Sequence, residues 1–185
     1  FGENIFNISS KFSVTPGFRF EYIKTQSEGE YKKINFDIAG NPILNEDIAD
    51  NREFNRAFVL LGVGLSYKPV KSLEVYGNIS QNYRSVTFND IRIANPSLVV
   101  DPNITDEQGY TFDLGARGRF GKYLSYDIGG FFLSYRDRLG VIVREVSDIQ
   151  EERFRGNIGD AVTYGLESFV DWNIMETFSA NRNFR

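Results

Sequence analysis

Charged side chains occupy alternate positions within an otherwise apolar and aromatic stretch, residues 110–120. Phe112 and Leu114 fall on one side of an extended chain, and Asp113, Arg117 and Arg119 fall on the other. A strand buried on both faces would exclude these charges, and a surface helix would space them by three and four. The stretch therefore predicts a β-strand with one apolar face and one face in water.

The same period of two recurs along the chain. Apolar residues alternate with polar or small residues in five segments: residues 12–22, 57–67, 73–80, 110–120 and 162–172. A further strand should start at Tyr123, where the consecutive Phe131, Phe132 and Leu133 predict a β-bulge. With the segment that precedes residue 9, we count seven strands, and residues 179–185 resemble the start of an eighth.

The connections between these segments alternate strictly between short and long. Short ones cover residues 9–11, 68–71, 121–122 and about 173–177, and long ones cover residues 26–56, 83–108 and about 138–160. Structureless loops of this length are uncommon in compact soluble domains. Short turns at one rim and long loops at the other are instead the anatomy of an outer-membrane barrel, whose tilted strands need about 9–11 residues.

Aromatic residues near the segment ends fit the same fold class, because membrane barrels carry aromatic girdles at both interfaces. They are Tyr22, Tyr67, Tyr110, Tyr123, Tyr126 and Trp172. We therefore predict an all-β chain: an antiparallel transmembrane β-barrel segment of about seven or eight strands, with short periplasmic turns and long extracellular loops.

Composition excludes most catalytic designs, because the chain contains neither cysteine nor histidine. Carboxylate chemistry remains, but nothing in the sequence places two carboxylates at the separation that a glycosidase needs. The net charge of −4, with both signs mixed, predicts no nucleic-acid partner. We expect no enzymatic activity, no cofactor and no metal site.

Five phrases of the sequence resemble, in order and spacing, the strand-and-loop phrases in the middle of one family of barrels. They are SVTPGFRFEYIKT, VYGNISQNYRSVTFNDI, DEQGYTFDLGARGRF, YDIGGFFLSYRDRLG and NIGDAVTYGLESFVDW. The family is the TonB-dependent outer-membrane receptors, and the similarity is greatest to the branch that imports ferric citrate and related iron chelates.

The resemblance implies that residues 1–185 are part of a receptor barrel domain in the outer membrane of a Gram-negative bacterium. No segment resembles the family's plug, its TonB-box peptide or its carboxy-terminal strand, so we expect a fragment of a longer receptor. The implied function is TonB-dependent uptake of ferric citrate or a siderophore. The implied partners are that chelate, membrane lipid, the plug domain of the same full-length chain, and the TonB complex acting through the plug.

Site residues follow from the same resemblance, which places residues 81–92 at the outer mouth. Arg84, Asn89 and Arg92 are the expected ligand contacts, because guanidinium groups hold carboxylates bidentately. The alternative is that Arg84 pairs with a neighbouring carboxylate in the lumen. The residues expected to face the lumen or the plug are Arg19, Glu21, Asp113, Arg117, Arg119 and Glu167. For Arg117 and Arg119, near the short-turn rim, carboxylates of the plug or the neighbouring wall are the expected partners.

Three other interpretations stay open at this point. A complete eight-stranded outer-membrane barrel would act as an adhesin, an anchor or a minor pore. A soluble β-sandwich would bind carbohydrate or protein. A carboxylate hydrolase is the third.

Overall fold

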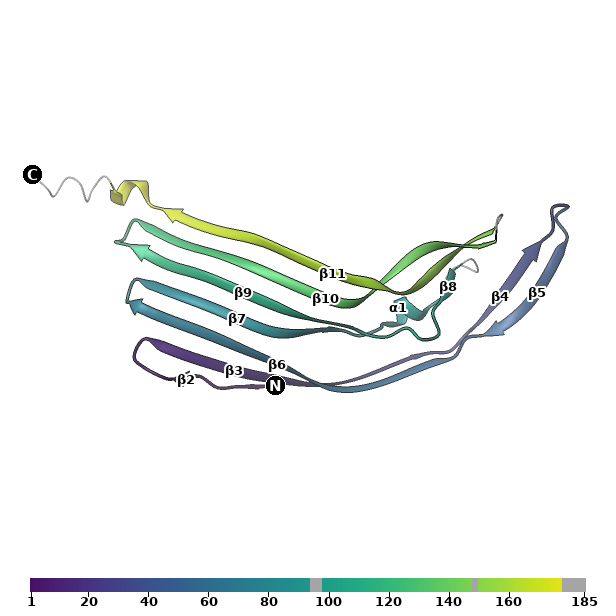
Figure 1. Cartoon of the computed structure of the whole chain (residues 1–185), viewed down its shortest axis with the longest axis horizontal. Coiled ribbons are helices and arrows are strands. Elements are labelled where there is room, and N and C mark those ends of the chain that lie inside the picture. The colour runs from purple at the N-terminus through teal and green to yellow at the C-terminus, as the bar shows by residue number, and fades with distance from the viewer. Residues whose placement is uncertain (94–97, 148–149, 178–185) are drawn as a thin grey trace, which may run out of the picture.

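The computed structural model describes residues 1–93, 98–147 and 150–177. Its main feature is one antiparallel sheet in which six long strands lie side by side in chain order (Figure 1). These strands are β3 (Phe12–Ser27), β6 (Arg52–Val70), β7 (Leu73–Arg84), β9 (Glu107–Phe120), β10 (Leu124–Ser147) and β11 (Gln150–Trp172). The predicted fold class is confirmed.

The strand expected before residue 9 is present as two short pieces. β1 (Gly2–Glu3) and β2 (Phe6–Asn7) both pair antiparallel with β3, through Gly2 opposite Phe18 and Phe6 opposite Val14. This interrupted strand and the six long ones make seven. The expected eighth strand, residues 179–185, lies outside the described residues.

The prediction that residues 26–56 and 138–160 are loops is wrong, because the strands continue through most of both ranges. β4 (Glu30–Phe36) and β5 (Pro42–Ala49) form a separate two-stranded hairpin beyond the end of β3. β10 and β11 stay paired as far as Ser147 and Gln150. Pairing within a hairpin satisfies backbone groups that a loop of this length would leave to water.

The connection between β7 and β9 is described over residues 85–93 and 98–106, which form a compact unit. It contains α1 (Phe88–Ile91) and β8 (Leu98–Val100), and β8 pairs parallel with residues 153–155 of β11. The buried apolar core of the described chain lies here and consists of Val86, Ile91, Leu98, Val100 and Ile104. Because a single-layer sheet buries few side chains, the core forms where the described residues of this connection pack against the strands.

The expected bulge lies a few residues later than predicted. Phe131, Phe132 and Leu133 pair in regular register with both β9 and β11. The register with β11 shifts between Tyr135 and Arg138 instead, where Asp137 adopts a φ of 57°. Three consecutive apolar side chains fit a regular strand here because Phe131 and Leu133 share the polar face with Asp127, and the glycine Gly165 leaves room for the Phe131 ring.

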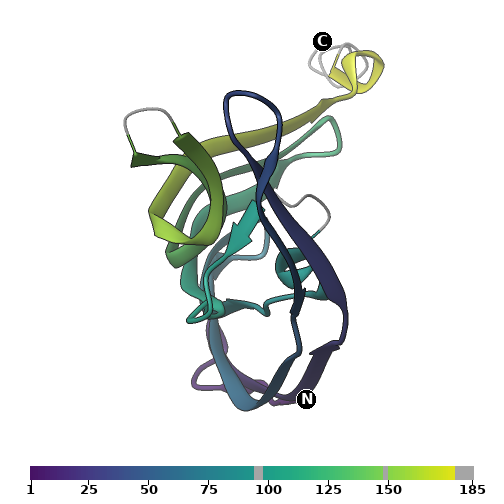
Figure 2. The same ribbon diagram turned by 90° about the vertical axis from the view of Figure 1, so that its right-hand side faces the viewer.

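The sheet is curved, as the view from its long-connection end shows (Figure 2), and its two faces differ in chemistry. The apolar face carries, among others, Phe20, Leu61, Leu114, Phe132 and Leu166, all exposed. The polar face carries, among others, Glu21, Glu74, Asp113, Arg117 and Asp127. Within the described part of the chain, no helix is long and apolar enough to cross a bilayer.

The wall divides at its long-connection end. β6 pairs with β7 only between Gly62 and Val70, whereas β6 and β3 remain paired up to Arg52. Beyond Gly62 the β3–β6 pair therefore separates from β7, β9, β10 and β11, and residues 85–93 and 98–106 lie between the two groups (Figure 1).

Candidate functional site on the polar face

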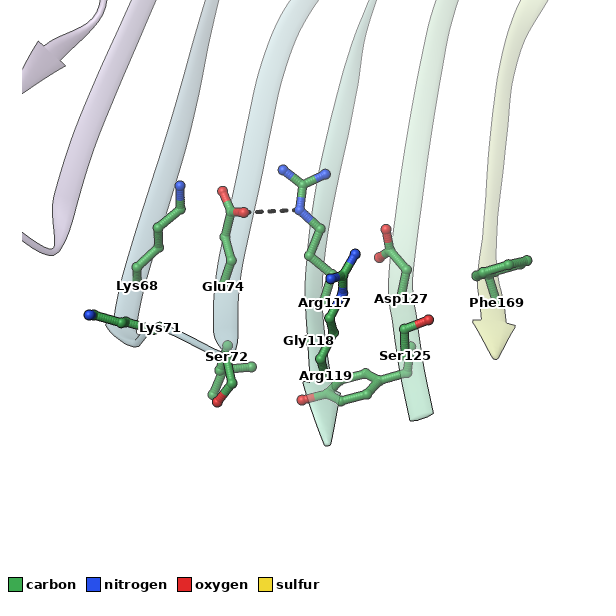
Figure 3. A pocket seen from close by; sticks show the side chains of 12 residues that line it. Lys68, Lys71, Ser72, Glu74, Arg117, Gly118, Arg119, Ser125, Asp127 and Phe169 are labelled. Atoms are coloured by element: carbon green, nitrogen blue, oxygen red, sulfur yellow. Dashed lines mark hydrogen bonds and ion pairs between the residues drawn. The ribbon is translucent and has the colours of Figure 1, made fainter. Parts of the chain in front are cut away.

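The polar face has a hollow of about 500 Å³ at the short-turn end, which we name the rim hollow. Five adjacent strands each contribute a side chain to it: Lys68, Glu74, Arg117, Asp127 and Phe169 (Figure 3). These side chains share one face because each lies at the polar-face position of its own strand.

Arg117 pairs with a carboxylate of the neighbouring strand. Its Nε lies 3.0 Å from Oε2 of Glu74, whose other oxygen accepts a 2.6 Å hydrogen bond from the Ser66 hydroxyl. Arg117 also lies 5.4 Å from the ring centroid of Tyr76. A wall carboxylate is therefore one partner of Arg117, as the sequence led us to expect.

Asp127, the second carboxylate of the rim hollow, also has a partner within the wall: it accepts a 2.8 Å hydrogen bond from the Tyr76 hydroxyl. Lys68, Lys71 and Arg119 also line the hollow, and none of the three has an ion-pair partner within the described ranges. The lining contains four cationic side chains and two carboxylates, Glu74 and Asp127, so the rim hollow carries a net positive charge.

The remaining residues predicted to face the lumen lie on the same face in separate small clusters. Arg19 pairs with Glu21 two residues along β3. Asp113 accepts a 3.3 Å hydrogen bond from Asn78 on the adjacent strand. Glu167 is exposed and has no ion-pair partner among the residues that the structure describes.

A second hollow, of about 430 Å³, lies on the polar face where β6 and β7 separate, and we name it the mouth hollow. Three of its lining side chains are guanidinium groups from different strands: Arg19, Arg84 and Arg138. The other lining residues are Leu60, Gln81, Asn82, Tyr83, Glu107 and Tyr135.

Glu107 organises the mouth hollow and is only 2% exposed. One of its oxygens lies 2.8 Å from Arg84 Nη1 and accepts a 2.9 Å hydrogen bond from the backbone N–H of Leu139. The other lies 3.3 Å from Arg138 Nε. We did not predict Glu107 as a site residue, although it lies at the same alternation as Asp113. Arg138, the partner of Glu107, was not predicted as a site residue either, because the sequence pattern placed it in a loop.

Of the three predicted ligand contacts, only Arg84 lines the mouth hollow. Its Nη2 also lies 3.0 Å from Asp90, so Arg84 joins two carboxylates. Asn89 lies in α1, where its backbone carbonyl accepts a 2.6 Å hydrogen bond from Arg155, and exposed Arg92 caps the end of α1. The structure thus separates Asn89 and Arg92 from the hollow that contains Arg84.

Asp90 also stabilises the start of α1. Burial raises the pKa of this carboxyl group, but hydrogen bonds from the Thr87 side chain and backbone, followed by Arg84, outweigh burial, and the net pKa lies below its ordinary value. The Thr87 N–H and hydroxyl donate to Asp90 over 2.9 and 2.7 Å. The ionised form of Asp90 is therefore the one that this connection favours.

The two groups of strands are joined by a polar cluster next to the mouth hollow. Arg56 of β6 forms an ion pair with Asp106, and Asp106 also accepts hydrogen bonds from the Tyr83 hydroxyl and from the backbone N–H of Val86. Side chains thus replace the missing backbone ladder between β6 and β7.

The family model for the β-barrel of TonB-dependent receptor-like proteins matches residues 1–185. The chain belongs to this family. The receptors of this family are transporters of the Gram-negative outer membrane and not enzymes. In membrane barrels the apolar face of the wall contacts lipid and the polar face lines the lumen. The small eight-stranded barrel, the soluble sandwich and the hydrolase are thereby set aside.

Solved structures of receptors support the fold. The copper transporter OprC has a TM-score of 0.66 at 13% identity, over 92% of this chain and 26% of its own. The ferric yersiniabactin uptake receptor FyuA from Yersinia pestis has a TM-score of 0.64 at 19% identity, over 92% and 23%. The FrpB iron transporter from Neisseria meningitidis has a TM-score of 0.61 at 14% identity, over 92% and 22%.

This chain therefore spans about a quarter of the length of the receptors that it matches. At these sequence identities the similarity concerns the fold alone. The three neighbours are named for different metals, copper in one case and iron in the other two. No curated protein matches the sequence significantly.

Proposed function

We propose that this chain is a middle section of the barrel wall in a receptor that imports a ferric chelate, either ferric citrate or a siderophore. The observation that carries the proposal is the mouth hollow, where Arg19, Arg84 and Arg138 gather at the long-connection end of the lumenal face. Iron chelates commonly expose oxyanions, and guanidinium groups bind oxyanions through paired N–H donors.

The ligand contacts in this proposal are Arg84 in the mouth hollow and Asn89 and Arg92 on α1. α1 lies beyond the end of β7, towards the long-connection end, so a ligand arriving from outside would meet α1 before Arg84 (Figure 1). Asn89 and Arg92 would then act at the first encounter and Arg84 deeper in the lumen.

The rim hollow has a different task in the proposal. Lys68, Lys71 and Arg119 would hold carboxylates of the plug domain of the full-length receptor, and Arg19, Glu21, Asp113, Arg117 and Glu167 would line the path beside it. The TonB complex would act through the plug. Support comes from the positive charge of the rim hollow, since an unpaired cation in a protein-filled lumen calls for an acidic partner.

Uptake by the intact receptor tests this function. A strain lacking the receptor gene is compared with the same strain carrying it, with and without a working TonB complex. Labelled ferric citrate, a labelled ferric siderophore and labelled copper are offered separately. We expect uptake of one ferric complex that needs both the receptor and TonB, and uptake of copper alone would contradict the proposal.

A further inference from the structure

The boundary between β6 and β7 changes along its length. Their backbone ladder runs from the short-turn end to Gly62, opposite Ser80, and does not continue beyond this pair. For a strand with about 3.3 Å per residue and a tilt of about 45°, Gly62 lies about 12 Å along the membrane normal from Tyr67, near the short-turn rim. The apolar band of a membrane barrel is about 25 Å tall. The ladder between β6 and β7 therefore ends near the middle of the bilayer.

One side chain bridges the two strands just beyond the last ladder pair. The side-chain carbonyl of Gln81 accepts a 2.9 Å hydrogen bond from the backbone N–H of Leu61. An unpaired backbone N–H in hydrocarbon is costly, so Gln81 satisfies a group that lipid cannot satisfy. Unlike a backbone carbonyl, the Gln81 amide can leave Leu61 through a change of side-chain rotamer alone.

The separation between the strands is limited in height. Further towards the long-connection end, the rings of Phe58 on β6 and Tyr83 on β7 lie 3.8 Å apart between their centroids. We name the opening between Gly62 and Phe58 the window. At about 3.3 Å per residue it is about 13 Å high, which admits a hydrocarbon chain between fixed upper and lower edges.

On the apolar face, the window opens into a hollow of about 260 Å³, which we name the outer notch. Its apolar lining residues are Leu61, Val63, Ile79 and Tyr110. Leu61, Ile79 and Tyr110 are 58%, 45% and 49% exposed on the face that contacts lipid. None of the described residues that line the notch is charged. An apolar hollow of this kind takes an apolar occupant in preference to water.

On the polar face, the window opens into a hollow of about 650 Å³, which we name the inner hollow. Arg19 and Leu60 line both the inner hollow and the mouth hollow, so these two hollows adjoin. The inner hollow and the outer notch share four residues: Leu61, Gly62, Ser80 and Gln81. Gln81 lines all three hollows. The lipid side and the lumenal side of the wall thus meet at Gln81.

We infer that the window takes the hydrocarbon tail of an acylated ferric chelate, whose polar head lies in the lumen while its tail passes Gln81 into the outer notch. The inference rests on the proposed function and narrows its substrate class to ferric chelates that carry a fatty-acyl tail. A tail kept in the aqueous lumen would lose the gain from apolar burial that the notch and the lipid beyond it supply.

The continuity of the three hollows selects this occupant over a lipid of the bilayer. A bilayer lipid keeps its headgroup at the membrane surface and would use the outer notch alone. A ligand with both a polar head and an apolar tail uses the two sides of the window together, because the inner hollow offers Arg19 and the notch offers only uncharged residues.

Binding to the intact receptor in lipid nanodiscs tests the inference, with binding to empty nanodiscs subtracted. The probes are ferric citrate and a ferric trihydroxamate, each with and without a dodecanoyl tail. For the head that the receptor accepts, the tailed form should bind about tenfold or more tighter, because burial of two methylene groups already supplies this factor.

A matched pair of variants locates the tail. Ile79→Trp fills the outer notch with an apolar side chain and should lower the affinity for the tailed probe to that for the tail-free probe. Ile128→Trp is the control, because Ile128 is 52% exposed on the same apolar face of β10 but lies outside the notch. A photoreactive group at the end of the tail gives a measurement on the unmodified receptor, where crosslinks should fall on β6 and β7 around the notch.

The outcomes separate the inference from the proposed function. A tail preference that disappears in Ile79→Trp and persists in Ile128→Trp supports the inference. Equal affinities for tailed and tail-free probes, or crosslinks spread over the whole apolar face, would overturn it and leave the proposed function standing. A preference that survives in Ile79→Trp would also overturn it, because the tail would then partition into the bilayer alone. If TonB-dependent uptake of every ferric complex is absent, tailed forms included, the proposed function and the inference both fail.

Discussion

The Arg56 guanidinium on β6 lies 2.6 Å from the Asp106 carboxylate, which belongs to the connection between β7 and β9. The two side chains are only 10% and 16% exposed. Arg56 also donates to the Thr25 hydroxyl over 3.1 Å and to the Val86 carbonyl over 3.4 Å. This pair therefore joins the two groups of strands at the level where the backbone ladder between them has ended.

Removing one partner of this pair should destabilise the long-connection end of the wall. Asp106→Ala leaves the largely buried Arg56 without its carboxylate, and we expect a loss of about 3 kcal/mol in the free energy of unfolding. The measurement is urea-induced unfolding of the intact receptor in lipid vesicles. Arg144→Ala, which breaks an exposed pair, should cost less than about 1 kcal/mol and serves as the control. Equal costs for the two variants would show that the Arg56–Asp106 pair does not join the strand groups.

The assignment of the lipid face is tested at Leu114. This side chain is exposed on the apolar face, so Leu114→Arg should cost about 2–4 kcal/mol when the receptor folds into lipid. Thr163→Arg is the matched control, because Thr163 is exposed on the polar face of β11 and an arginine there would remain in the aqueous lumen. Similar folding free energies for the two variants would reverse the assignment of the faces.

We predict that position 115 must be glycine, because the Tyr76 ring occupies the space that a side chain would need. A Cβ atom at this position would collide with the Tyr76 ring and would lie 2.9 Å from the Ile128 carbonyl oxygen. Gly115→Ala should therefore displace Tyr76 from Asp127 and cost about 1–3 kcal/mol in the free energy of unfolding. Gly64→Ala, whose Cβ would meet its nearest neighbour at 3.8 Å, should be close to neutral in the same assay. A neutral Gly115→Ala variant would show that Tyr76 does not need this space.

The α1 connection should loosen in acid because of Asp90. Its pKa in the folded protein lies below the ordinary value of 3.8, so its ionised form stabilises the connection above that pH, and this contribution is lost as the pH falls through the lowered pKa. Hydrogen exchange of residues 85–93 in the intact receptor should stay constant from neutral pH down to about pH 4 and then lose protection. Asp90→Asn should show weaker protection at neutral pH and little further loss in acid. A pH profile identical to that of the unmodified receptor would exclude Asp90 as the cause.

The structure also changes how Arg84 should be tested. Arg84→Ala would leave Glu107 with fewer cationic partners in a nearly buried position, so reduced stability and reduced ligand binding would be confounded. Arg92→Ala avoids this problem because Arg92 is exposed at the end of α1. If Arg92 contacts the chelate, this variant should bind the chelate several-fold more weakly with an unchanged free energy of unfolding. Unchanged affinity would remove Arg92 from the proposed contacts.

The sequence by itself determined that the chain forms a wall of long strands and which face the residues of the predicted strands occupy. The alternation of Phe112 and Leu114 with Asp113 and Arg117 depends only on the period of an extended chain, which is local. Charged residues in the middle of an aromatic strand require lipid on one side and water or protein on the other. That reasoning placed all six predicted lumenal residues on one face of the sheet.

Only the tertiary structure decided how the long connections fold and what they bring together. Glu107 meets Arg138 across more than 30 positions of sequence, a contact set by the pairing of β9 with β10 and by the shift of register after Tyr135. The separation of β6 from β7 beyond Gly62, which opens the mouth hollow, has no counterpart in the alternation of either strand. A local period predicts the direction of a side chain, but its partner depends on register, on where pairing ends, and on which distant segment fills the space.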